Sequence, residues 1–187
     1  HTDDPDLTVV CADVASLYPS IPINFGLQAV RNFLLGISIR ARHGEKIPVD
    51  ISLQQIDVII DLLKWVLTNN YMQFMGVVYH QLTGTAMGTP AAVMYADIVL
   101  AYLEHPVLNR VKPLYYGRYL DDIFCLLHQK DKDDIIKLFN QRCAAIQLDG
   151  VTQGTSGIFL DMEISISAHS THPTTKLYQK PTNRFMY

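Results

Sequence analysis

Length, composition and charge set the first bounds on this protein. The chain has 187 residues, 49% of them hydrophobic, so it is long enough to bury one substantial core, and we expect a single domain spanning residues 1–187. The formal net charge of −3 argues against a free-standing nucleic-acid binder, because phosphate neutralisation by cations supplies most non-specific affinity. We expect no membrane span and no secretory signal, since no uncharged apolar stretch reaches the roughly 18 residues that a span needs.

The first half of the chain predicts a strand followed by two amphipathic helices. Residues 8–14 form a continuous apolar run with β-branched members, typical of a strand covered on both faces. Apolar residues then repeat at helical spacing over 27–34 and again over 56–67, where Ser52 and Gln55 form a capping box. The polar, glycine-containing stretch 40–46 between them predicts a surface loop.

The middle of the chain predicts a hairpin, a glycine loop and a helix. Residues 71–81 are aromatic and β-branched with a central glycine, the pattern of a β-hairpin. A glycine loop follows at 84–88. Thr89 is a good N-cap and Pro90 a good first residue for a helix that runs to Leu103.

The last third predicts strands around one more helix. Residues 114–127 read as two short apolar strands joined through adjacent aspartates, and an amphipathic unit begins at Asp131. Residues 158–166 alternate apolar and polar side chains, typical of a strand, and 176–180 are expected to pair beside them.

Three cysteines form an odd set without metal-like spacing: Cys11, Cys125 and Cys143. Each stands among apolar neighbours, as reduced buried thiols do. This pattern predicts an intracellular compartment.

One carboxylate lies inside the first predicted strand. Asp13 ends the run VVCADV, where an isolated ionised carboxylate is costly to bury, so a compensating group is expected. For a lone aspartate in a strand, the first explanation is a capped turn or an arginine partner such as Arg118.

Two further carboxylates change that interpretation. Asp121 and Asp122 stand between two apolar strands, and although an aspartate pair alone is usually a turn, here a strand-ending Asp13 precedes it. Three acids at one sheet edge can bind two Mg²⁺ ions about 3.5–4 Å apart, with Mn²⁺ as the alternative ion. That arrangement activates an attacking oxygen and stabilises a leaving one in phosphoryl displacement, and the metals would neutralise the buried carboxylates.

Motifs along the chain resemble those of the reverse transcriptase family. DVASLY at Asp13–Tyr18 resembles its motif A and YLDD at Tyr119–Asp122 its motif C, in matching order and spacing. Within that family the sequence is most similar to Penelope-like retroelements. The segments that carry this likeness are SLYPSIP from Ser16, GTAMGTP from Gly84, YADIVLAYLE from Tyr95, RYLDDIF from Arg118, FLDMEI from Phe159 and LYQKPTN from Leu177. They cover nearly the whole chain from Thr8 onward.

The resemblance implies an α+β polymerase palm, an antiparallel sheet carrying the acids with helices packed on one face. The chain would span motifs A to E, with fingers and thumb largely absent. Asp13 and Asp121 would bridge the metals and Asp122 would assist, while Tyr18 would take the steric-gate position beneath the incoming sugar. The residues implied in nucleotide binding are Val14, Tyr18, Gly84, Met87, Gly88 and Thr89. The residues implied in the primer grip are Phe159, Leu160 and Asp161.

Each of these secondary roles has a structural alternative. Tyr18 could pack at a strand end, the glycines of 84–88 could serve only the helix entry, and Phe159 could belong to the core. Two departures from the family pattern also stand out. Gln81 lies three residues before Gly84 rather than next to it, and the motif D lysine has no counterpart around Gln147, so the proton donor to pyrophosphate is left open.

The function implied is RNA-directed DNA polymerisation: extension of a DNA primer on an RNA template with deoxynucleoside triphosphates, expected in the nucleus. The missing fingers and thumb regions of the parent protein would be partners, and the isolated fragment could be inactive. One alternative is an RNA-dependent RNA polymerase or a telomerase-like enzyme with the same acids, although Tyr18 argues against the former. The other is a non-catalytic scaffold for RNA or protein, like the reverse-transcriptase-like domain of the spliceosomal core protein, which need not keep its metal ligands.

Overall fold

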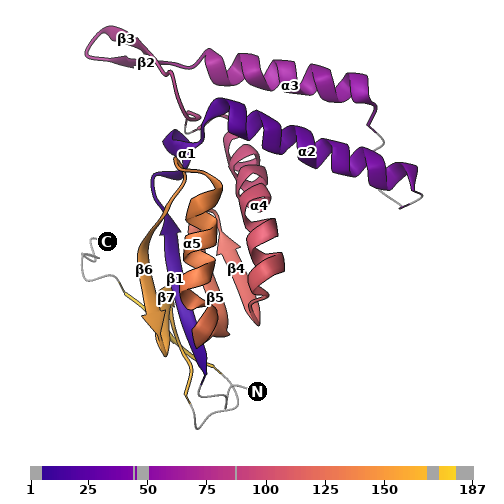
Figure 1. The fold of residues 1–187 in the computed structure, drawn as a ribbon. Helices are drawn as coiled ribbons and strands as arrows, with labels where there is room; N and C mark the ends of the chain where they lie inside the picture. The colour runs from indigo at the N-terminus through magenta and orange to yellow at the C-terminus, as the bar shows by residue number, and fades with distance from the viewer. Residues whose placement is uncertain (1–5, 44, 46–50, 87, 168–172, 180–187) are drawn as a thin grey trace. The chain divides into compact units, whose positions relative to one another are not determined.

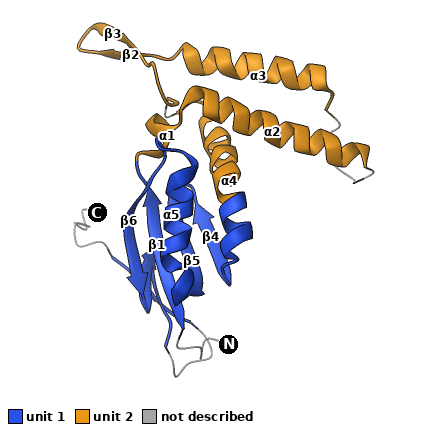
Figure 2. Cartoon of the chain, viewed as in Figure 1, with its two compact units in different colours: residues 1–15, 106–187 blue, residues 16–105 orange. Residues whose placement is uncertain are grey.

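The structure, a computed structural model, describes residues 6–43, 45, 51–86, 88–167 and 173–179. Contacts divide the chain into two compact units, residues 1–15 with 106–187, and residues 16–105 (Figure 2). The chain combines helices with antiparallel sheets, so the predicted α+β class is confirmed. The prediction of a single domain over residues 1–187 stays a prediction. No helix within the described ranges is long and apolar enough to cross a membrane.

The first unit is built on a four-stranded antiparallel sheet in the order β4-β5-β1-β6 (Figure 1). Its strands are β4 (Tyr115–Tyr119), β5 (Asp122–His128), β1 (Leu7–Val14) and β6 (Leu148–Gly154). β1 lies inside the sheet and is buried along its length except at Asp13. The sequence predicted β1, β4 and β5 but not β6, because LDGVTQG carries two glycines and no apolar alternation. Pairing with β1 makes it a strand.

A second, three-stranded sheet follows in the order β7-β8-β9, formed by β7 (Ser156–Phe159), β8 (Met162–Ser165) and β9 (Thr174–Leu177). The prediction of one continuous strand over 158–166 is wrong, because the chain turns at Leu160, whose φ is 56°, and forms a hairpin. The apolar alternation continues through the two-residue turn and hides it. A partner strand after β8 is confirmed, with Lys176 Nζ 2.8 Å from Glu163 Oε2.

One hydrophobic core joins these two sheets. Its buried members are Leu7, Val9, Cys11, Phe124 and Ile166. Gly157 of β7 lies directly against β1, since a Cβ there would meet Cys11 Sγ at 2.4 Å and Val9 Cγ1 at 2.9 Å. Only a glycine lets the second sheet approach β1 this closely.

The opposite face of the four-stranded sheet carries helix α5 (Lys132–Arg142), which follows the short 3₁₀ turn η1 (Gln129–Asp131) and contacts β6 (Figure 1). Ile135 and Phe139, one turn apart, are its buried residues. The amphipathic unit predicted from Asp131 is confirmed.

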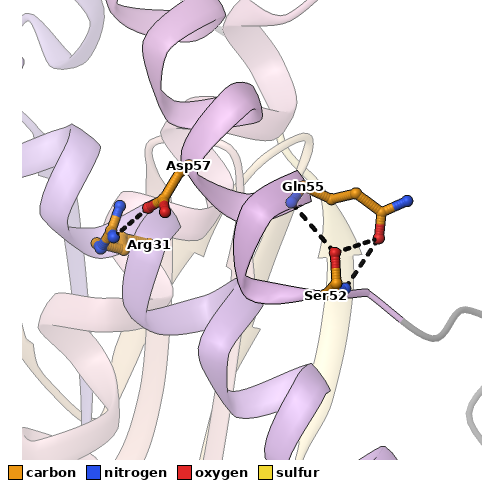
Figure 3. Close-up of polar contacts among 4 residues, drawn as sticks. All are labelled: Arg31, Ser52, Gln55 and Asp57. Carbon is orange, nitrogen blue, oxygen red and sulfur yellow. Dashed lines mark hydrogen bonds and ion pairs between the residues drawn. The ribbon is translucent and has the colours of Figure 1, made fainter.

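In the second unit, the short helix α1 (Leu17–Ser20) precedes α2 (Ile23–Arg42) and α3 (Leu53–Thr68), and α2 and α3 lie side by side (Figure 1). The predicted capping box is confirmed: Ser52 Oγ accepts from Gln55 N at 3.3 Å, and Ser52 N donates to Gln55 Oε1 at 2.9 Å (Figure 3). An ion pair between Arg31 and Asp57 links the two helices (Figure 3).

The surface loop predicted over 40–46 begins later than expected. Arg40 and Arg42 lie in the last turn of α2, where cations favour the negative end of the helix dipole, and the helix closes at His43. The loop prediction is therefore wrong for these two arginines. Residues 44 and 46 lie outside the described part of the chain.

The predicted hairpin is present as β2 (Tyr71–Phe74) and β3 (Val77–His80). Met75 and Gly76 form its two-residue turn with φ angles of 48° and 79°, the pair of positive values that a type I′ hairpin turn requires. The rings of Tyr71 and His80, directly opposite each other, stack with centroids 4.7 Å apart. Both strands are exposed along their whole length.

Helix α4 (Ala92–Val111) begins in the second unit and ends in the first. The predicted start at Pro90 is two residues early, and the Thr89 hydroxyl donates to Ala86 O at 3.1 Å within the preceding turn. The helix also continues beyond the predicted end, through Pro106, a residue that usually breaks helices. Leu103 and Val107, one turn apart and both buried, fall on either side of that proline.

Two of the three thiols behave as predicted. Cys11 and Cys125 are free and buried, whereas Cys143 is free and half-buried. Burial is the largest cause that raises the pKa of Cys11, to about 11, so this thiol stays protonated at neutral pH.

Candidate active site

Two of the three predicted metal ligands face each other across neighbouring strands. β1 and β5 are antiparallel, and Asp13 is the direct partner of Asp122 in their register. Directly opposite residues of an antiparallel pair project from the same face of the sheet. Asp13 is the exposed residue of β1 and lies between the buried Ala12 and Val14.

Asp121 sits in the turn between β4 and β5, next to that pair. Tyr119 and Asp122 close the hairpin, and Leu120 adopts a φ of 53° in the two-residue turn. The turn is tied to β1, because Val14 N donates to Asp121 O at 3.0 Å, and to β4, because Arg118 Nη1 donates to Leu120 O at 3.0 Å. Arg118 was the alternative partner predicted for Asp13, and this hydrogen bond instead has it supporting the aspartate turn.

A fourth carboxylate, Asp149, was missed by the sequence reasoning. It lies in β6 as the partner of Asp13 on the other side of β1, next to a shift in register between Cys11 and Asp13. Its Oδ1 accepts from Gly150 N at 2.7 Å. No local signal could have revealed it, because β6 carries no strand pattern and only the pairing with β1 brings Asp149 beside Asp13.

This arrangement changes the ionisation of Asp13. Its pKa is raised above the ordinary value, first because burial desolvates the charged form and then because Asp121 and Asp122 are negative neighbours. A backbone hydrogen bond from Val14 lowers it, and Asp149 adds a weaker increase. A cation bound beside Asp13 would favour its charged form and lower this pKa again.

The aspartates fit a metal ion by the chemistry of their oxygen donors. Carboxylate oxygens are the ligands that Mg²⁺ prefers, and Asp13, Asp121 and Asp122 offer them at one end of the sheet. Among the described residues, however, no group of three or more histidine, cysteine, aspartate or glutamate side chains is gathered as a metal site would be.

The predicted sugar gate and glycine loop belong to the second unit. Tyr18 lies in α1, half-buried, and its carbonyl accepts from Thr85 N at 2.9 Å. Gly84 packs on the same helix: a Cβ at this position would lie 2.4 Å from Pro19 Cα, and the φ of Gly84 is +73°. The structure thus brings Tyr18 and the start of the loop together.

The remaining nucleotide-binding predictions fall at different places. Val14 is fully buried and its N–H donates to Asp121 O, so neither its side chain nor its N–H is open to a nucleotide. Gly88 has a φ of +91° with open space around it, and Thr89 lies beside it in the turn before α4. Met87 lies outside the described residues. All of these roles stay predictions.

The predicted primer grip forms the tip of the β7–β8 hairpin. Phe159 packs against the hydrophobic core, its ring 5.8 Å from that of Phe124. Leu160 and Asp161 make the turn, and Asp161 O accepts from Tyr178 N at 2.8 Å. Phe159 belongs to the core, and the primer-grip roles of Phe159, Leu160 and Asp161 stay predictions.

The fold recurs in solved telomerases. Apo telomerase from Candida tropicalis truncated from its C-terminal domain aligns with a TM-score of 0.62 and 12% identity, over 91% of this chain and 35% of that one. Telomerase from Candida albicans in complex with the TWJ fragment of telomeric RNA aligns with a TM-score of 0.63 and 10% identity, over 88% of this chain and 30% of that one. A second structure of apo telomerase from Candida tropicalis aligns with a TM-score of 0.63 and 14% identity, over 86% of this chain and 32% of that one.

No protein-family model and no curated protein matches this sequence. The chain spans about a third of the length of the telomerases, and identities of 10 to 14% show a shared fold alone. The predicted α+β fold is confirmed, and it is a fold that these solved telomerases share.

Proposed function

We propose that this chain is the catalytic palm of an RNA-directed DNA polymerase of the Penelope-like kind. The observation that carries the proposal is the direct pairing of Asp13 with Asp122 beside the Asp121 turn. Two like charges placed directly opposite each other destabilise a sheet. A bound cation would neutralise them, and such arrangements are found at functional sites.

Asp13, Asp121 and Asp122 would hold two Mg²⁺ ions, with Mn²⁺ as a substitute. The ions would supply activation of the primer 3′ hydroxyl and stabilisation of the leaving pyrophosphate oxygen. The protein's own contribution is rigidity: Val14 N and Arg118 hold the aspartate turn against β1 and β4, so the carboxylates need little reorganisation.

The substrates proposed are an RNA template, a DNA primer and deoxynucleoside triphosphates, with a nuclear location. The Candida albicans telomerase of the same fold is in complex with RNA, which supports an RNA ligand. With a net charge of −3, this chain has little general attraction for phosphates. We therefore propose that the fingers and thumb of a longer polypeptide supply most of the grip on nucleic acid.

Sugar selection is proposed for Tyr18 together with the loop that follows Gly84. The hydrogen bond between Tyr18 O and Thr85 N, and the close approach of Gly84 to Pro19, fix the loop to α1 within one unit. These contacts hold the backbone of α1 beside the loop, and the ring of Tyr18 would exclude a 2′ hydroxyl by its shape.

A telomerase-like enzyme is the second candidate, and the fold shared with the solved telomerases supports it. The two differ in template use: a telomerase-like enzyme copies a short template repeatedly, whereas a retroelement enzyme copies a long one once.

The test is primer extension by the 187-residue protein and by the longest natural polypeptide that contains it, on matched RNA and DNA templates. Magnesium-dependent extension on RNA that is lost in Asp13→Asn supports the proposal. Absence of extension by the longer polypeptide, with RNA binding intact, would overturn it in favour of a non-catalytic scaffold. Repeated copying of a short template would favour the telomerase-like enzyme.

A further inference from the structure

The position of Asp149 depends on a β-bulge in β6. Cys11 of β1 pairs with Thr152 of β6. An unbroken antiparallel register would then pair Asp13 with Gly150, but the structure pairs Asp13 with Asp149, so β6 carries one extra residue here. Gly150 has a φ of +57°, the left-handed conformation that a glycine supplies in one common type of bulge. The extra residue therefore moves Asp149 into the place opposite Asp13.

The bulge also sets the face of the sheet from which Asp149 projects. Side chains alternate between the two faces of a strand, so without the bulge Asp149 would project from the face opposite to that of Thr152. The side chain of Thr152 is hydrogen-bonded to the Cys11 thiol, so these two residues share a face. Asp13 follows Cys11 by two residues and lies on that face as well. As direct partners, Asp149, Asp13 and Asp122 now project from one face, and bulges that re-aim a side chain in this way are frequent beside active sites.

The three carboxylates follow one another across neighbouring strands, with Asp122 on β5, Asp13 on β1 and Asp149 on β6. Neighbouring strands lie about 4.8 Å apart, a spacing similar to the roughly 3.5–4 Å between the ions of a two-metal site. A cation held by Asp13 on its β6 side would therefore lie nearer to Asp149 than to Asp122. Because Mg²⁺ usually keeps several of its water molecules, Asp149 can act on such an ion through a water.

The backbone around Asp149 is held in place. Asp149 Oδ1 accepts from Gly150 N at 2.7 Å, which orients the carboxylate. The start of β6 is tied to α5, because Leu148 N donates to Asn140 Oδ1 at 2.8 Å and Gln147 Nε2 donates to Asn140 O at 2.9 Å. The ion pairs formed within the described ranges do not include Asp149, so its charge is available to a cation.

We infer that Asp149 is a positioning residue of the cation site, which holds the divalent ion bound by Asp13 through water molecules of that ion. The inference rests on the proposed function, because that function brings the ion to Asp13. A negative charge close to a divalent cation strengthens its binding, and at an exposed position salt screens this effect. The contribution of Asp149 should therefore be largest at low ionic strength.

The first test is a manganese titration of the 187-residue protein at low ionic strength, with free Mn²⁺ measured by electron paramagnetic resonance. Asp149→Asn keeps an oxygen that can accept from Gly150 N and removes the charge, so the variant should fold and bind Mn²⁺ about threefold more weakly or worse. Asp149→Glu restores the charge and should recover most of the lost affinity.

Asp134→Asn is the matched control, because it removes the same charge from an exposed position of α5 and should leave the affinity unchanged. Circular dichroism checks that all variants keep their secondary structure. Equal affinity of the wild type and Asp149→Asn would overturn the inference, and so would equal losses in Asp149→Asn and Asp134→Asn. A wild type that binds no Mn²⁺ would overturn it together with the cation site.

The second test measures the magnesium concentration that gives half-maximal primer extension by the longest natural polypeptide that contains this chain. Asp149→Asn should raise this concentration about threefold or more and change the rate at saturating magnesium much less, because Asp13, Asp121 and Asp122 remain. A purely structural role would instead lower the rate at every magnesium concentration.

The two possible failures are distinguishable. Extension by the wild type with an unchanged magnesium requirement in Asp149→Asn would overturn this inference and leave the proposed function standing. Absence of extension by the wild type would overturn the proposed function, and the manganese titration, which needs no catalysis, would then decide the role of Asp149.

Discussion

Asp13 and Asp122 are direct partners across the β1–β5 ladder, and Asp149 is the partner of Asp13 on the β6 side. A row of carboxylates thus crosses three adjacent strands at the level of Asp13, the exposed residue of β1. Like charges placed directly opposite each other weaken an antiparallel sheet. The fold tolerates this cost, and a bound cation would offset it.

Asp121→Asn should abolish primer extension, with a loss of at least about 100-fold, the scale expected when one preorganised electrostatic group is removed. The fold should remain, because the turn is held by the backbone of Asp121 and by Arg118, and the melting temperature should stay equal or rise as carboxylate repulsion falls. Asp134→Asn, an exposed aspartate of α5, is the matched control and should keep activity. Near-normal extension by Asp121→Asn would refute the two-metal assignment.

The stability of the protein should depend on pH through Asp13. Its pKa is raised in the folded state, chiefly by burial and by Asp121 and Asp122, so the folded protein binds this proton more tightly than the unfolded chain does. The free energy of unfolding should therefore fall as pH rises above the ordinary carboxyl value of 3.8 and through the raised pKa.

Asp13→Asn removes this titration and should be more stable than the wild type at pH 7. The difference should shrink as pH is lowered toward about 4, where the wild-type carboxyl regains its proton. Urea unfolding of both proteins across this range measures it. A stability difference that does not change with pH would contradict the prediction.

Magnesium should stabilise the wild type by preferential binding to the folded state. An ion bound with a Kd of about 1 mM contributes about 1.4 kcal/mol at 10 mM. The melting temperature of the wild type should be higher in MgCl₂ than in NaCl of equal ionic strength, and Asp13→Asn should lose most of this increase. An identical melting temperature in both salts would show that the carboxylates do not form a site in the folded chain.

Gly84→Ala should destabilise the protein by about 2 kcal/mol or more, since a positive φ and a clash with the backbone of Pro19 both oppose a side chain there. Gly36→Ala is the matched control: this glycine lies within α2 with open space around it, so the change should stabilise by about 0.5–1 kcal/mol. Chemical denaturation compares them. Equal effects of the two changes would mean that the close approach of the loop to α1 is not needed for folding.

Tyr18→Ala should allow ribonucleotide incorporation while costing less for deoxynucleotides, because a clash with the 2′ hydroxyl is removed and the carboxylates remain. The ratio of kcat/KM for a matched ribonucleotide and deoxynucleotide pair reports this directly. Tyr18→Phe keeps the ring and serves as the control, with an unchanged ratio expected. If the ratio is also unchanged in Tyr18→Ala, Tyr18 only packs in α1 and the gate lies elsewhere.

Local sequence determined much of this protein. The apolar run of β1, the capping box at Ser52, and the Met75–Gly76 turn each follow from interactions within a few residues, so their patterns are legible in the sequence. The aspartates of motifs A and C were also identified there, first from their places at the ends of predicted strands and then from the resemblance.

Tertiary pairing decided the rest. β6 has no strand pattern of its own and exists because β1 offers it an edge, and this places Asp149 beside Asp13. The turn at Leu160 was hidden, because an alternation of apolar residues looks the same along one strand and through a tight hairpin. Contacts between segments distant in the chain depend on strand register and on burial, and a short stretch of residues determines neither of these.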